Sequence, residues 1–227
     1  IFNEPGDSGL NNILAGFWNA WQELSKNPES LAVRSEVRQR GITLAETFRH
    51  LYRQLTQLQE DLNFNVGVTV DKINTIATQL VDLNWQIARS VVAGDNPNDL
   101  RDRRDLLIDE LSKLIDITVA EQADGTVAVA IGGRNLVEGL KADALQVVSD
   151  PLNQNFYAVQ WSDGASVDFT SGSIAGMVWT RDQGVAEILE QLDELAVTLI
   201  SEVNSVHQAG YGLDGTSGND FLTGTGA

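Results

Sequence analysis

The chain has 227 residues, 42% of them hydrophobic, which is enough to bury the core of one or two folded domains. Its 15 basic and 32 acidic residues give a formal net charge of -17. This balance excludes nucleic acid and anionic membrane as main partners, because both bind clustered lysine and arginine. The chain has no cysteine, which excludes disulfides, thiolate metal ligands and cysteine nucleophiles. No run of residues approaches the roughly 18 apolar side chains that span a bilayer.

The first part of the chain predicts two helices. Asp7 or Ser8 can cap the first of them, and Asn27-Pro28 stops it. The second helix runs without a proline from about Leu31 to Val92. A bend or fraying is expected near Gly67, because glycine weakens a helix by about 1 kcal/mol relative to alanine.

Two long apolar stripes run along the predicted helices. Residues at steps of three and four connect Leu44 to Ile87, and the same spacing connects Val185 to Val206. Such steps place the side chains of a stripe on one face of a helix. Two stripes far apart in sequence can bury each other only if the chain returns on itself. The sequence therefore predicts that both pack antiparallel in one bundle, alongside the helices before residue 28 and after residue 97.

A short charged helix is predicted from Leu100 to about Leu114, after a turn at residues 94–97. Its acidic and basic side chains, Arg104 among them, indicate a solvated outer face laced with ion pairs. The predicted core face holds Leu100, Leu107, Leu111 and Leu114.

The period changes to that of strands after residue 116. Ile117–Glu121 and Val127–Ile131 flank Asp124-Gly125, which is a strong hairpin signal. Isolated hairpins are marginal in water, so this block is expected to be stabilised partly by docking on the bundle. Further short strands are predicted at Asn135–Val137, Leu145–Val148, Phe156–Trp161 and Val167–Phe169. The helical period resumes near residue 172 and lasts to about residue 208.

These elements predict a mainly α fold with a small β insertion (α+β). The expected architecture is an elongated antiparallel helical bundle with coiled-coil-like long helices and an antiparallel β subdomain. Residues 1–116 and 173–210 are predicted to form a discontinuous helical domain, and residues 117–172 a β-hairpin subdomain. Residues 211–227 are interpreted as a glycine-rich connector towards a further domain.

Few residues suggest chemistry. Gly6-Asp7-Ser8-Gly9 matches the string around the nucleophile of chymotrypsin-like proteases, but no histidine precedes it, so a helix cap is favoured. His50 and His207 have no second metal ligand at helical spacing, and both are interpreted as ordinary surface or boundary histidines. We therefore predict no catalytic, cofactor-binding or metal-binding residue.

Two further patterns are interpreted structurally. The segment 215–222 resembles one unit of the calcium-binding nonapeptide repeat, but one unit cannot supply six or more oxygen ligands, so no specific calcium site is predicted. A set of tryptophans could suggest a ligand cage, yet they are expected to fill the core or the helix junctions. The set is Trp18, Trp21, Trp85, Trp161 and Trp179.

Several segments together carry a family resemblance. Each motif alone is modest, but the ordered set is specific and covers nearly the whole chain. The segments are Phe2–Pro5, Phe17–Ser30, Leu83–Ser90, Asn98–Leu114, Asp124–Gly139, Gly172–Asp182 and Val203–Leu222. With these segments the chain resembles the FlgK family, the flagellar hook-associated proteins of the first hook–filament junction.

The resemblance implies a structural adaptor of the bacterial flagellum, part of the junction between hook and filament, with no enzyme role and no cofactor. It implies an extracellular protein exported through the flagellar type III channel. The implied partners are the flagellar hook protein, neighbouring copies of the chain and the second junction hook-associated protein, which leads to the filament. An export chaperone at a C-terminus beyond these residues is also implied. The chain is then expected to be an internal fragment without the family's two terminal segments.

Two alternatives stay open. One is a secreted adhesin or effector stalk whose β block binds a ligand. The weaker one is a hydrolase that uses Ser8 or a pair of acidic residues. In solution the isolated chain is expected to be monomeric, because its apolar stripes have partners within the chain and its net charge makes copies repel each other.

Overall fold

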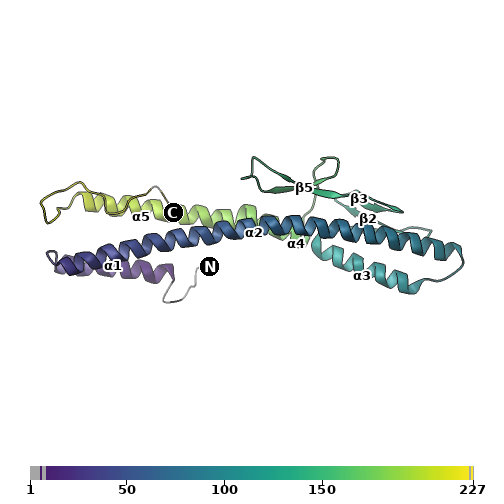
Figure 1. The fold of residues 1–227 in the computed structure, drawn as a ribbon, viewed down its shortest axis with the longest axis horizontal. Coiled ribbons are helices and arrows are strands. Elements are labelled where there is room, and N and C mark those ends of the chain that lie inside the picture. The colour runs from purple at the N-terminus through teal and green to yellow at the C-terminus, as the bar shows by residue number, and fades with distance from the viewer. Residues whose placement is uncertain (1–5, 7–8, 225, 227) are drawn as a thin grey trace. The chain divides into compact units, whose positions relative to one another are not determined.

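The structure is a computed structural model that describes residues 6, 9–224 and 226 (Figure 1). About 61% of it is helical, with a small antiparallel sheet region, which is the predicted fold class. The predicted caps Asp7 and Ser8 lie outside the described residues. None of the helices in the described ranges is long and apolar enough to cross a membrane. The helices are α1 (Leu10–Lys26), α2 (Leu31–Val92), α3 (Asn98–Leu114), α4 (Gly172–Trp179), a π-helical turn (Thr180–Gly184) and α5 (Val185–Gln208).

The strands form two small antiparallel sheets. One has the order β1-β2-β3-β4, and the other pairs β5 with β6. The expected strand at residues 167–169 is wrong, since this segment is irregular, and the two-residue β4 was missed. The bounds are β1 (Thr118–Glu121), β2 (Val127–Ile131), β3 (Arg134–Glu138), β4 (Lys141–Ala142), β5 (Leu145–Ser149) and β6 (Tyr157–Trp161).

The chain divides into two compact units, and α2 contributes to both. Unit 1 comprises Ile1–Leu58 with Gly184–Ala227, and unit 2 comprises Gln59–Gln183. This division differs from the predicted one, in which residues 1–116 and 173–210 formed one domain. That the predicted domains each fold as a unit stays a prediction.

The long stripe of α2 therefore has two sets of partners, and the expectation that both stripes pack in one bundle with the flanking helices is wrong beyond residue 58. The reason is length. The 24 residues of α5 span about 36 Å, whereas the 62 residues of α2 span about 93 Å at about 1.5 Å per residue. Only the part of the stripe before residue 59 shares a unit with α5.

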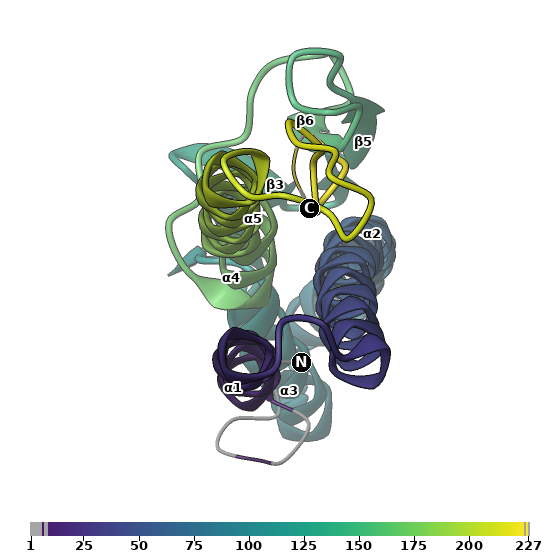
Figure 2. The same cartoon turned by 90° about the vertical axis from the view of Figure 1, so that its left-hand side faces the viewer.

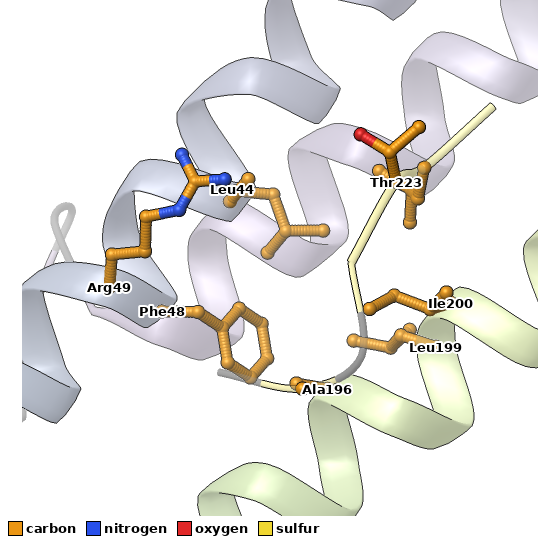
Figure 3. Close-up of a pocket in the computed structure, with 10 residues that line it drawn as sticks. Leu44, Phe48, Arg49, Ala196, Leu199, Ile200 and Thr223 are labelled. Atoms are coloured by element: carbon orange, nitrogen blue, oxygen red, sulfur yellow. The ribbon is translucent and has the colours of Figure 1, made fainter.

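In unit 1, α1, the first part of α2 and α5 pack around a common apolar core, with the C-terminal segment lying between α5 and α2 (Figure 2). One narrow groove is lined by Leu44, Phe48 and Arg49 of α2 and by Ala196, Leu199 and Ile200 of α5 (Figure 3). Val37 and Val203 line a second hollow. Going from Val37 to Phe48 along α2, the facing residues of α5 run backwards from Val203 towards Ala196. These two helices are therefore antiparallel, as predicted.

We expect Leu192→Ala to lower the free energy of unfolding by about 2–5 kcal/mol, because the substitution leaves a cavity in this core. The Leu192 side chain is only 4% exposed. The matched control is Leu195→Ala on the same helix, where leucine is 38% exposed and the loss should stay below about 1 kcal/mol. Urea unfolding followed by circular dichroism measures both. Equal losses would contradict the burial described here.

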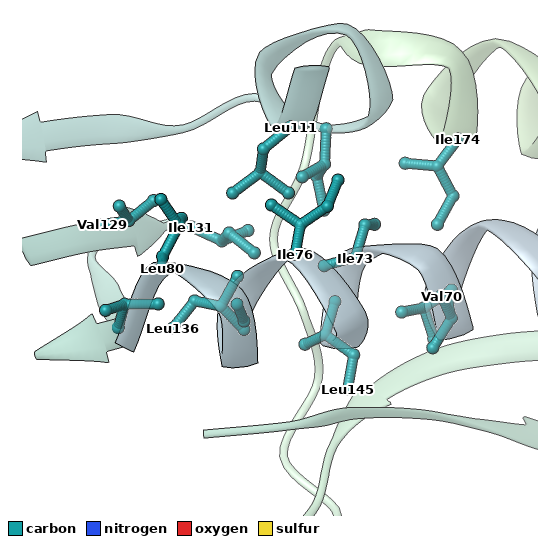
Figure 4. Close-up of a cluster of buried hydrophobic side chains, with 14 of the residues drawn as sticks. Val70, Ile73, Ile76, Leu80, Leu111, Val129, Ile131, Leu136, Leu145 and Ile174 are labelled. Carbon is teal, nitrogen blue, oxygen red and sulfur yellow. The ribbon is translucent and has the colours of Figure 1, made fainter. Parts of the chain in front are cut away.

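In unit 2, the second part of α2 is covered by α3, α4 and the sheets. Its core joins α2 residues to apolar residues of every neighbouring element (Figure 4). Ile73 and Leu80 are fully buried between Leu111 of α3, Ile174 of α4 and the strands. The strands therefore complete a core with α2 rather than forming one of their own.

Two asparagines of α2 fix the strands on the helix. The Asn84 amide donates to the carbonyl of Val127 at 2.8 Å and accepts from its N–H at 3.0 Å. Asn74 does the same with Leu145, at 2.8 Å for both bonds. Each side-chain amide thus makes the two hydrogen bonds that a neighbouring strand would make with the N–H and C=O groups of one residue. Register between sheet and helix is set by these polar contacts as well as by packing.

The charged outer face predicted for α3 is partly wrong. Arg104 is 6% exposed, donates to the carbonyl of Gly125 at 3.0 Å and lies 3.1 Å from the Asp105 carboxylate. It occupies a core position of the 3–4 register between Leu100 and Leu107. Its guanidinium holds the hairpin turn that follows β1, so the charge has a structural partner there.

Candidate functional site

A cluster of aromatic side chains closes one end of unit 1. The ring of Phe221, from the C-terminal segment, lies 6.0 Å from Phe17, 5.0 Å from Trp21 and 5.6 Å from His207, measured between centroids. It packs over Gly41 of α2, where an added Cβ would come within 2.8 Å of the Phe221 ring. Gly41 is therefore a packing position that admits the ring rather than a weak point of the helix.

The C-terminal segment is held on the bundle by hydrogen bonds. The Asn204 side chain accepts from the N–H groups of Phe221 and Leu222, both at 2.9 Å, and donates to the Leu222 carbonyl at 2.7 Å. His207 Nδ1 lies 2.7 Å from the Asn219 carbonyl oxygen, which requires that nitrogen to carry a proton. The glycine-rich segment predicted as a connector is thus, up to residue 224, a strap folded over unit 1.

A hollow of about 650 Å³ lies between α1, the start of α2, α5 and this strap. Its lining is mostly apolar and includes Trp18, Trp21, Val206 and Tyr211. The Trp21 Nε1–H is buried, and no residue in the described part of the chain accepts its hydrogen bond. The volume suits a small ligand or a few side chains of a partner, but the lining offers no arrangement of nucleophile, base and orienting group.

The loop that resembles a calcium repeat is an ordinary turn. Asp214 Oδ1 accepts from the Thr216 hydroxyl at 2.7 Å and from the Thr216 N–H at 3.0 Å. These hydrogen bonds, the hydroxyl's first, hold the pKa of Asp214 below its ordinary value. In the described part of the chain no group of three or more metal-ligating side chains is found.

Calcium titration of this loop should therefore give no specific binding. Asp214 and Asp220 supply too few oxygens, and one Asp214 oxygen already accepts two hydrogen bonds. Isothermal titration calorimetry of the 227-residue protein, with an Asp214→Asn variant as control, is the measurement. Stoichiometric binding tighter than about 1 µM that is lost in the variant would contradict the prediction.

A second polar centre lies inside unit 2, around Arg181. This arginine is 1% exposed and sits in the π-helical turn. Its guanidinium bonds to the Asp182 carboxylate at 2.6 and 2.9 Å, to Asn63 Oδ1 at 2.8 Å and to the Tyr157 carbonyl at 3.1 Å. Gln59 donates to the Arg181 carbonyl at 2.8 Å. The positive charge of Arg181 is matched by the carboxylate of Asp182. The centre therefore joins α2, β6 and the π turn rather than exposing a reactive group.

This centre was not predicted from the sequence, although the spacing of its residues indicates a buried arginine. Ile174, Val178, Arg181 and Val185 follow steps of four, three and four, so Arg181 stands at a core position of the register. A charged residue at such a position indicates a buried partner.

A third charged cluster ties the two sheets together. Arg134 of β3 bonds to the carboxylates of Asp143 and Asp163 and stacks over the Trp161 ring, 4.5 Å from its centroid. A backbone hydrogen bond from Ala165, and then the Arg134 guanidinium, hold the pKa of Asp163 below its ordinary value. The cluster is a structural link and has no free base or nucleophile.

The remaining candidate residues are Ser8, His50 and the tryptophans. Ser8 is outside the described residues, and His50 is exposed on α2. The tryptophans are expected to fill the core or the helix junctions. Trp161, which is 2% exposed, lies in the core, whereas Trp18, Trp85 and Trp179 lie outside it, with exposed fractions of 44%, 47% and 64%.

The chain matches one family model over residues 1–222, described as the flagellar hook-associated protein FlgK helical domain. It is similar to flagellar hook-associated protein 1 of Bacillus subtilis (strain 168), with 34% identity over 100% of this chain and 50% of the relative. It is also similar to flagellar hook-associated protein 1 of Salmonella typhimurium, with 31% identity over 95% of this chain and 41% of the relative.

A solved structure agrees with these matches. It is the flagellar hook junction protein FlgK from Burkholderia pseudomallei, which superposes with a TM-score of 0.81 at 26% identity. The match covers 94% of this chain and 40% of that one. The chain spans half or less of the length of these relatives.

Proposed function

The chain belongs to the FlgK family of flagellar hook-associated proteins, and from that premise we propose that it is the helical part of a structural adaptor in the hook–filament junction of the bacterial flagellum. The observation that carries the proposal is the family match over residues 1–222, which includes both compact units. A geometric role suits the described residues. Their polar centres at Arg181, Arg134 and Arg104 are matched internally and hold secondary structures together.

The proposed partners are the hook protein, neighbouring copies of the chain, the second junction hook-associated protein and an export chaperone. The proposed location is the extracellular flagellum, reached through the flagellar export channel, and the proposed role involves no enzyme activity. The family resemblance of the sequence supports each of these statements. The alternative of an adhesin stalk has no such support, because the relatives described above are hook-associated or hook junction proteins.

Deletion of the gene that encodes these residues tests the proposal. We expect cells that keep their hooks and lose their filaments, with filament subunits released into the medium. The intact gene supplied in trans should restore filaments. An adhesin would give the opposite pattern, in which filaments stay normal and adhesion falls. Adhesion must therefore be compared with that of a strain whose complete filaments are paralysed. Normal filaments in the deletion strain would reject the adaptor role.

A further inference from the structure

The charges of unit 1 are separated between two helices. The part of α2 in this unit, residues 31–58, holds five arginines and two glutamates, so it contains a third of the chain's 15 basic residues. The helix α5 holds five acidic residues and no lysine or arginine. A chain with a net charge of -17 thus presents one basic helix and one acidic helix in the same unit.

The arginines of α2 form a stripe on its exposed side. Arg49 and Arg53 are four residues apart, and Arg38 lies eleven residues, or about three turns, before Arg49, so all three share a face. All three are exposed, whereas Leu44, Phe48, Leu51 and Leu55 are buried on the other side of the helix. We name Arg38, Arg49 and Arg53 the arginine stripe.

The acidic side of α5 is built in the same way. Glu187, Glu190 and Glu194 follow steps of three and four, which place them on one face. All are exposed, and Val185, Leu192 and Ala196 are buried on the opposite face. We name Glu187, Glu190 and Glu194 the glutamate stripe.

Neither stripe finds its counter-charge within the described chain. Among the described residues of unit 1, the ion pairs are Lys26–Glu23 and Arg40–Glu36. Neither pair includes a residue of the arginine stripe or the glutamate stripe. Arg49 and Arg53, like Glu190 and Glu194, are like charges at a spacing of four, which destabilises an isolated helix. The two stripes lie on helices at separate corners of unit 1 (Figure 2), so they leave opposite charges on two surfaces of one molecule.

From this arrangement we infer that the arginine stripe of one copy binds the glutamate stripe of a second copy of the chain. Arg49 and Arg53 are about 6 Å apart along the axis of α2, and Glu190 and Glu194 are about 6 Å apart along α5, at about 1.5 Å per residue. Two ion pairs can therefore form together when the helices lie side by side. The inference rests on the proposed function, which places copies next to one another.

The contact is heterologous, because different surfaces of the two copies meet. Each added copy exposes a new arginine stripe, so the contacts repeat in one direction and produce a ring or a helical row rather than a closed pair. Exposed ion pairs are weak, and the net negative charge separates free copies, so the isolated chain stays monomeric. Within an assembly, where copies are held together, the stripes select the neighbour and its register.

Cysteine cross-linking in assembled flagella is the first test, since these residues contain no cysteine. The full-length protein, with any cysteine outside this region replaced, carries Arg53→Cys together with Glu194→Cys and is treated with a flexible bismaleimide. We expect a ladder of dimers and larger multimers from the double variant and none from either single variant. The matched control is Arg103→Cys with Asp109→Cys on exposed positions of α3. The proposal is overturned by the absence of a ladder, by an equal ladder in the control or by products with a different protein only.

Charge reversal is the second test. Arg49→Glu with Arg53→Glu, and separately Glu190→Lys with Glu194→Lys, should each lower the number of filaments by about tenfold or more, because like charges then face each other. All four substitutions in one chain should restore filaments, since each interface regains its opposite charges. Thermal melting of the 227-residue variants and the amount exported to the medium should match the wild type.

Failure of restoration, or normal filaments with either pair reversed, would reject the stripes as an interface. The proposed function is judged separately by the gene deletion. A deletion strain without filaments, together with neutral charge reversals, rejects only the contact between stripes. A deletion strain with normal filaments rejects the adaptor itself.

Discussion

We expect Gly172→Ala to lower the free energy of unfolding of unit 2 by about 2–5 kcal/mol, from left-handed backbone strain and overpacking together. Gly172 begins α4 with φ +87°. A Cβ there would stand 2.6 Å from the Ile115 nitrogen and 2.6 Å from the Leu114 oxygen. These are backbone atoms at the end of α3, and Ile115 is fully buried, so the overlap cannot be relieved by rotating a side chain.

The matched control is Gly164→Ala. Gly164 has φ +89°, nearly the same as Gly172, but nothing lies within 4 Å of an added Cβ. Only the backbone strain remains at that position, which is worth about 1–2 kcal/mol. Urea unfolding of both variants, followed by tryptophan fluorescence and circular dichroism, separates the two terms. Equal losses in the two variants would show that α3 and α4 do not approach as closely as described.

Arg181→Ala should lower the free energy of unfolding of unit 2 by about 3–5 kcal/mol, because it removes one partner of a buried charged network. Asp182 would lose its counter-charge, and the Tyr157 carbonyl would lose a donor. Arg181→Lys keeps the charge but cannot form the fork of bonds to Asp182 and Asn63, so it should rescue only part of the loss.

The control for Arg181 is Arg103→Ala, which removes an exposed arginine from α3 of the same unit. Its effect should stay within about 0.5 kcal/mol, as is usual for surface positions. Chemical unfolding is monitored by the fluorescence of buried Trp161 in a background where the other four tryptophans are replaced by phenylalanine, so that the signal reports on unit 2. If Arg181→Ala and Arg103→Ala unfolded at the same urea concentration, the network around Arg181 would not be a stabilising one.

The bounds of the long helices follow from local sequence patterns. α2 begins and ends at the predicted Leu31 and Val92, because nothing between them breaks a helix and the apolar residues keep one period. It is continuous through Gly67, near which a bend or fraying was expected. The glycine has a packing role that sequence does not show, since the Tyr157 ring lies against it at 3.6 Å from the position of an added Cβ. The family followed from ordered motifs, which are also local features.

Which surfaces meet depends on how distant segments pack in the folded chain. Periodicity identifies the face of α2 that is buried, but the same stripe serves α5 before residue 59 and the sheets with α3 beyond it. The sequence has no local sign of where one partner replaces the other, because both are apolar.

The buried polar residues show the same limit most clearly. Asn84, Arg104 and Arg181 are among the least exposed residues, although their types favour solvent. Each stands in the apolar register, which the sequence does reveal. The carboxylates beside the two arginines, Asp105 and Asp182, are adjacent in sequence, but other partners lie far away along the chain, such as Val127 for Asn84 and Tyr157 for Arg181. A side chain's spacing is fixed by its own helix, whereas these distant hydrogen-bond partners reach it only when the chain has folded.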